Sequence, residues 1–241
     1  MDDVIGRDLG SMRHGLLAVG AGLAGLAWFW SELAPSRLGF ADTDDPSVSL
    51  AFLRAHPDAW ALTGLLGLLL AGLLAATALV VHDRLARTAG PLAARWTTIV
   101  GLAAAGSFFL FGVLRSSVHP VLYIDELAPR WGESAYLAVQ MAGVHGVEQA
   151  GVLALGAWIV GVAWLGVRAG VLPPLLAVLA LVPALRLVAL LGPVGLLPGS
   201  DLLWIVFVAA IPVSMIWLVA LGLVLARPAR SSRSAAEPAW S

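Results

Sequence analysis

Six long apolar runs, separated by short polar connections, constrain this chain more than any other feature of its sequence. About 20 apolar residues are needed to cross roughly 30 Å of hydrocarbon as a helix. Runs of that order cover residues 15–34, 60–81, 96–114, 135–167, 171–191 and 202–226. They predict an all-α fold, a polytopic membrane bundle of six transmembrane helices in a single domain over residues 1–230. Residues 231–241 are polar, and we expect them to form a disordered tail.

Two of the runs carry signs of irregular helix geometry. The fourth run would be about 50 Å long as one helix, which exceeds the hydrocarbon thickness. We expect it to project outward or to kink near Gly143, Gly146 or Gly151. Pro183 interrupts the fifth run and predicts a kink there.

The distribution of arginine predicts the orientation of the bundle, because basic residues accumulate in cytoplasmic connections. One side of the six runs holds nine arginines and the other holds three. The nine are Arg7, Arg13, Arg84, Arg87, Arg95, Arg168, Arg227, Arg230 and Arg233, and the three are Arg37, Arg54 and Arg130. We therefore expect both termini in the cytoplasm (N-in, C-in) and residues 35–59 as an external loop, with a short amphipathic helix over residues 49–56 on the membrane surface. Tryptophans near the predicted span ends fit an interfacial belt: Trp28, Trp30, Trp60, Trp96, Trp131 and Trp204.

Composition limits the classes of partner that the protein can bind and indicates the membrane in which it lies. All 14 residues in the lysine-plus-arginine count are arginine, a usage typical of a GC-rich bacterial genome, which indicates the bacterial cytoplasmic (inner) membrane. The formal net charge of −1 argues against a nucleic-acid partner. There is no cysteine, so thiolate chemistry is excluded. The sequence contains no phosphate-binding or hydrolase signature, and no cofactor is predicted.

Ionisable residues inside apolar runs are the strongest functional signal, since each costs at least about 2.5 kcal/mol at the bilayer centre. Arg115 ends the third run, His145, Glu148 and Arg186 lie within runs, and His119 and Asp201 lie just beyond run ends. In the predicted topology all six residues share the outer half of the bundle. They are therefore the candidate site.

Spacing and depth predict contacts within this candidate site. Glu148 and Arg186 have similar predicted depths, and we expect them to form an ion pair with Arg115 as a second partner. Met141, His145 and Glu148 fall on one face of a regular α-helix. A metal site at His145 and Glu148, or a haem between His119 and His145, has less support, and no metal is predicted.

The candidate site residues are compatible with three functions. An outward-facing polar pocket would handle an amphipathic or anionic lipid-like small molecule by binding or transport, through Arg115, His119, His145, Glu148, Arg186 and Asp201. An intramembrane acid–base enzyme, such as an isoprenoid or terpene cyclase or isomerase, would use Glu148, His145 and Asp201 as catalytic residues. An accessory subunit would pack against a membrane-protein partner or another copy of the chain, and the charges would then only tie helices together. Membrane lipids are expected contacts in every case.

Three stretches of the chain resemble a bacterial family of integral membrane proteins described as domain of unknown function 4386. They are FLRAHPDAWALTGLLGLLLAGLLAATALVVHDRLAR, RAGVLPPLLAVLALVPALRLVALLG and LPGSDLLWIVFVAAIPVSMIWLVALGLVLAR. Each combines an apolar helix with a basic residue at its end. The resemblance implies six membrane helices and assigns no catalytic residue.

Overall fold

The computed structural model describes residues 2–38, 45–191 and 201–227, and within these residues the chain is helical apart from short turns. The expected disordered tail lies outside the described residues. The α-helices are α1 (Asp2–Arg37), α2 (Pro46–Ala55), α3 (Pro57–Thr88), α4 (Pro91–Ser116), α5 (Val118–Leu127), α6 (Pro129–Val139), α7 (Gln149–Arg168), α8 (Pro174–Leu179), α9 (Leu181–Leu191) and α10 (Asp201–Leu225). A π-helix, η1 (Gln140–Glu148), joins α6 to α7. The all-α prediction is confirmed.

Among the described residues, five helical segments are long and apolar enough to cross a membrane. They are Ser11–Leu33, Pro57–Thr88, Pro91–Leu127, Trp131–Arg168 and Val208–Leu225. Five of the six predicted runs thus appear as long apolar helices. The count of six spans and the orientation stay predictions.

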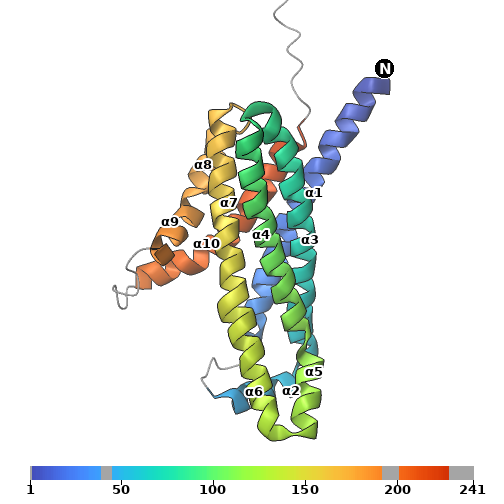
Figure 1. The fold of residues 1–241 in the computed structure, drawn as a ribbon, viewed down its shortest axis with the longest axis vertical. Helices are drawn as coiled ribbons and strands as arrows, with labels where there is room; N and C mark the ends of the chain where they lie inside the picture. Colours follow the sequence, from blue (N-terminus) through green and yellow to red (C-terminus); the bar gives the residue numbers. More distant parts are fainter. Residues whose placement is uncertain (1, 39–44, 192–200, 228–241) are drawn as a thin grey trace, which may run out of the picture.

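The fifth predicted run differs from expectation, because it forms two short helices instead of one long helix. α8 ends at Leu179 and α9 begins at Leu181. The proline ring of Pro183 clashes with the carbonyl group four residues earlier, which belongs to Leu179, and it provides no N–H group to bond that carbonyl. Figure 1 shows that α8, α9 and the first part of α10 diverge from the bundle and stop well short of its lower end.

The remaining long helices pack lengthwise around one hydrophobic core. α3 packs along α4 and α1, α1 along α10, and α4 along α7. One end of the bundle carries the α3–α4 connection and the last turns of α7 and α10 (Figure 1), and with them Arg84, Arg87, Arg95, Arg168 and Arg227. We call it the arginine-rich end. The other end is covered by α2, α5 and α6, and we call it the capped end (Figure 1).

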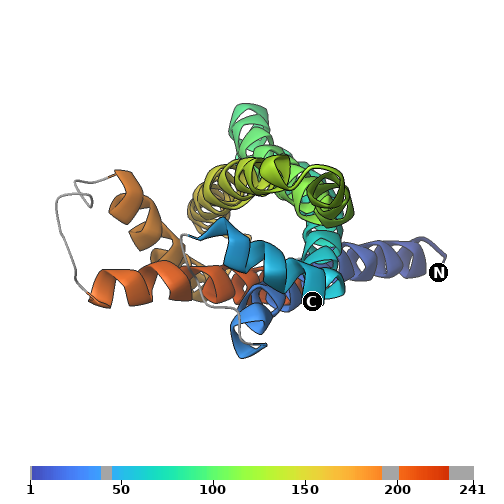
Figure 2. The same cartoon turned by 90° about the horizontal axis from the view of Figure 1, so that it is seen from below.

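The capped end has a small core of its own. Leu50 and Leu53 of α2 pack with Trp60, Val121 and Tyr136, each at most 6% exposed. α2 was expected to lie on the membrane surface, whereas the structure packs it against α5, α6 and the start of α3. The view from this end shows α2 lying across the bundle (Figure 2). The helices at this end therefore form a folded cap.

An ion pair and a helix cap hold this region together. The Arg54 guanidinium donates hydrogen bonds to the buried Asp125 carboxylate and so joins α2 to α5. The Asp45 carboxylate accepts hydrogen bonds from the side chain and the backbone of Ser47, which lowers the pKa of Asp45 and caps the N-terminus of α2.

Tryptophans at the two ends divide into two groups. Trp30 and Trp131 near the capped end and Trp96 near the arginine-rich end are each more than half exposed, as interfacial residues should be. Trp28 and Trp60 were also expected at the interface, but they are almost fully buried. The reason is packing, since Trp28 lies edge-on against Phe108 and Phe111 inside the bundle. The side chain of Trp204 lies outside the described residues.

The orientation is testable with single cysteines, because the natural chain has none. Ala51 on α2 and Leu92 at the start of α4 are both exposed and lie at opposite ends of the bundle. A membrane-impermeant maleimide should label Ala51→Cys on intact cells, and should label Leu92→Cys only after lysis. The reverse pattern would overturn the N-in prediction.

Candidate polar site within the bundle

The best-connected charged residue inside the bundle is Arg115, near the end of α4. Its side chain is 6% exposed, and its Nη2 atom lies 2.8 Å from Glu32 Oε2 on α1. Its Nη1 atom donates to Gln140 Oε1 on η1 at 3.1 Å. The guanidinium carbon also lies 3.3 Å from the centre of the Trp60 ring on α3. The structure thus places Arg115 inside the bundle, where it links four helical segments.

Glu148 ends the π-helix and is 8% exposed. It interacts electrostatically with Arg115 and Arg186 and is repelled by Glu32. Among the described residues, the Glu148 carboxylate accepts no hydrogen bond and forms no ion pair within 4.0 Å. The fully buried polar atoms without a hydrogen-bond partner in the described structure do not include the Glu148 oxygens, so this carboxylate retains some exposure and can accept a hydrogen bond from a further donor.

Arg186 on α9 is 2% exposed, and its Nη2 atom donates to Gln149 Oε1 at 2.8 Å. The expected Glu148–Arg186 ion pair is not among the ion pairs of the described side chains, which are Arg54–Asp125 and Arg115–Glu32. The prediction of direct contact was therefore wrong, although the two residues are near enough to interact electrostatically. The amide of Gln149, the neighbour of Glu148 in the chain, takes the predicted place of the carboxylate.

The π-helix also changes which residues share a face. In a π-helix each hydrogen bond spans five residues instead of four, so residues seven apart no longer align. Met141 is 58% exposed, whereas Glu148 is buried. The expected common face of Met141 and Glu148 is therefore corrected. The departure from α-geometry covers Gly143 and Gly146, near which the sequence predicted a kink.

Three of the expected site residues are located only by their backbones. His119 lies in the first turn of α5, His145 within η1, and Asp201 at the start of α10. Their side chains lie outside the described part of the structure, so their roles stay predictions. Among the described residues, no group of three histidine or carboxylate side chains could hold a metal ion.

Sequence reasoning missed three members of the site: Glu32, Gln140 and Gln149. Glu32 is a carboxylate near the end of the first apolar run, and the two amides lie in the fourth. The rarity of charged residues in such runs could have revealed Glu32. The polar cluster, as we call it, consists of Glu32, Arg115, Gln140, Glu148, Gln149 and Arg186.

The polar cluster is balanced in charge and closely packed. It contains two glutamates and two arginines. Buried polar atoms without a hydrogen-bond partner in the described structure include Glu32 Oε1 and Arg115 Nε within the cluster and Ser116 Oγ beside it. A small hollow beside Arg186, bordered by Pro183 and Ser214, has no room for a water molecule. The cluster therefore offers polar groups to a ligand that would have to displace side chains to reach them.

The fold and this cluster define a class: an all-α protein, with helices suited to multiple membrane crossings, that buries a charged network among them. No protein-family model, curated protein or solved structure matches the chain. The resemblance to the family described as domain of unknown function 4386 stays a prediction.

Proposed function

We propose that this multi-pass membrane protein binds an amphipathic small molecule whose polar head group lies against Glu148 in the polar cluster. The observation that carries the proposal is the buried Glu148 carboxylate, which lacks a hydrogen bond from the described residues. A hydrogen-bond donor on a ligand would supply the partner that the described residues do not. The location of Glu148 in a π-helix supports the proposal, because π-helical turns occur frequently at functional sites.

The charge balance of the cluster favours one kind of head group. Arg115 already has Glu32 as its counterion at 2.8 Å. A bare anion would therefore compete with a carboxylate already in place. A polar or zwitterionic head group that donates hydrogen bonds fits the cluster better, and the apolar helices around it suit a hydrocarbon tail.

Mass spectrometry of the intact protein, purified in mild detergent, tests this function. We expect a co-purified amphiphile on the wild-type protein and a loss of occupancy of about tenfold in Glu148→Gln, which corresponds to about 1.4 kcal/mol of binding free energy. Glu133→Gln is the matched control, since Glu133 on α6 is exposed, and it should retain the wild-type occupancy. Equal occupancy in Glu148→Gln and wild type, or no bound amphiphile in any sample, would contradict the proposal.

The same variant separates binding from acid–base catalysis, the second candidate function. The buried carboxylate of Glu148 favours that candidate too, because burial is a common way to prepare a general acid. A catalytic Glu148 predicts that Glu148→Gln retains or accumulates an unconverted ligand, whereas wild type carries the product. A Glu148 that only binds predicts loss of the ligand from Glu148→Gln.

A further inference from the structure

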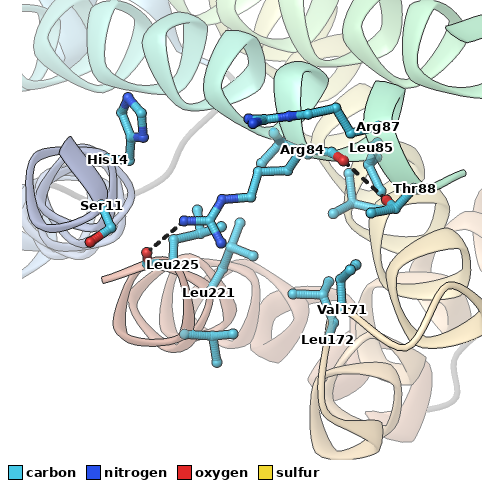
Figure 3. Close-up of a pocket in the computed structure, with 13 residues that line it drawn as sticks. Ser11, His14, Arg84, Leu85, Arg87, Thr88, Val171, Leu172, Leu221 and Leu225 are labelled. Carbon is cyan, nitrogen blue, oxygen red and sulfur yellow. Dashed lines mark hydrogen bonds between the residues drawn. The ribbon is translucent and has the colours of Figure 1, made fainter. Parts of the chain in front are cut away.

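A second site lies at the opposite end of the bundle from the polar cluster. A hollow of about 460 Å³ opens between α1, α3, α7 and α10 at the arginine-rich end (Figure 3). Pockets that bind small molecules typically have about 300–1,000 Å³. The hollow shares no residue with the polar cluster and plays no part in the proposed function.

One edge of this pocket is cationic. The side chains of Arg84 and Arg87, both from the last turns of α3, line it: the Arg84 guanidinium reaches toward Leu225 on α10, and that of Arg87 lies along α3 (Figure 3). Arg84 Nη2 donates to the Leu225 carbonyl oxygen at 3.0 Å, and Arg87 Nε donates to the Asp83 carbonyl oxygen at 2.8 Å. These contacts leave further N–H donors on both side chains, because each guanidinium carries five.

The positive charge of this edge is not neutralised within the described structure. The lining contains no carboxylate, and neither arginine has an acidic side chain within 4.0 Å among the described residues. Ser11 and His14 of α1 and Thr88 of α3 add further polar groups to the same pocket. Two neighbouring cations without a counterion attract an anion with several oxygen atoms.

The other residues that line the pocket are mostly apolar. Its apolar walls come from α3, α7, α10 and the turn after α7, and they include Val81, Leu85, Val162, Leu172, Leu221 and Val224. A cationic edge beside an apolar chamber matches a molecule with an anionic head and a hydrocarbon tail. The location at one end of the bundle also suits a lipid, because lipid phosphates lie at the ends of membrane helices.

We propose that this pocket binds a phosphate-bearing amphiphile, with the phosphate between Arg84 and Arg87 and an acyl chain against Leu221 and Val224. Arginine forms paired, charge-assisted hydrogen bonds to phosphate oxygens. Basic pockets between membrane helices hold anionic lipid head groups by this chemistry. Free phosphate carries the same head-group chemistry but lacks the tail, so a test must separate the two.

Binding to delipidated full-length protein tests the proposal with three probes: dioctanoyl phosphatidic acid, dioctanoyl phosphatidylcholine and inorganic phosphate. We expect phosphatidic acid to bind at least about tenfold more tightly than either of the others, since only it combines an uncompensated anionic head with a tail. Equal affinity for phosphatidic acid and phosphatidylcholine would overturn the assignment of the cationic edge. Equal affinity for phosphatidic acid and inorganic phosphate would overturn the assignment of the apolar chamber.

Variants locate the binding. Arg87→Gln should weaken phosphatidic acid binding about tenfold. The variant should fold normally, because among the described residues the Arg87 side chain bonds only within its own helix. Arg84→Gln should weaken binding similarly, although it also removes the bond to α10. Val171→Trp should block the chamber and weaken phosphatidic acid binding without changing phosphate binding. Arg95→Gln, an exposed arginine outside the lining, is the matched control and should bind as wild type does. Wild-type affinity in both Arg87→Gln and Val171→Trp would refute the site.

Discussion

Replacing Arg115 with glutamine should destabilise the protein by about 3–5 kcal/mol, the range measured when one partner of a buried ion pair is removed. The substitution leaves Glu32, whose side chain is 19% exposed, near Glu148 without its nearest cation, and it removes the hydrogen bond to Gln140. It also removes the stacking of the guanidinium on Trp60. The measurement is the free energy of unfolding in detergent micelles.

A double-mutant cycle isolates the contribution of the pair. Glu32→Gln alone should also be destabilising, and the double variant should recover part of the combined loss, with a coupling energy above about 1 kcal/mol. The Arg54–Asp125 pair is the matched control, because the Arg54 side chain is 55% exposed whereas that of Arg115 is 6% exposed. Coupling in the control should be smaller, since water screens Arg54. Equal coupling energies in the two pairs would show that the burial of Arg115 does not strengthen its interaction with Glu32.

Gly222→Ala should separate α1 from α10 and destabilise the bundle by about 1–3 kcal/mol. A Cβ atom at Gly222 would lie 2.6 Å from both the carbonyl oxygen of Gly15 and the backbone nitrogen of Val19. The contact is reciprocal, because a Cβ at Gly15 would lie 2.6 Å from the Gly222 carbonyl oxygen. Backbone atoms cannot rotate away as a side chain can, so one helix must shift.

Gly72→Ala is the control for this prediction. Gly72 lies within α3, and an added Cβ atom would meet nothing within 4 Å. The change should therefore be neutral, or stabilising by at most about 1 kcal/mol from helix propensity. Thermal unfolding of both variants measures the difference. If Gly222→Ala were as stable as Gly72→Ala, the close approach of α1 and α10 would be refuted.

Much of the architecture follows from local sequence. Each long helix lies within or around an apolar run, because a run of about 20 apolar residues without charges is stable in lipid only as a helix. The break between α8 and α9 follows from Pro183, although the sequence predicted a kink and not the end of a helix. The convergence of Arg115, Glu148 and Arg186 was predictable from the depth of each residue along its run, and all three are buried together in the structure.

The pairing of these charges could not be predicted in the same way. Depth places a residue along a helix axis but leaves the rotation of the helix about that axis undetermined. The rotation of α1 turns Glu32 toward Arg115, and the π-helix turns Glu148 away from direct contact with Arg186. A π-helical segment forms where tertiary packing favours it, so α-helical spacing misplaced Met141.

The sequence by itself determined the helical class, the positions of the long apolar helices and the presence of buried charges among them, because these depend on properties of single helices in an apolar solvent. The tertiary structure decided which charges touch, which tryptophans are buried, and where a pocket remains. The pocket at the arginine-rich end illustrates the difference, since its lining comes from segments as far apart in the chain as Ser11 and Leu225. Only the packing of α1, α3, α7 and α10 brings those segments together, and this packing depends on contacts such as that of Gly15 with Gly222.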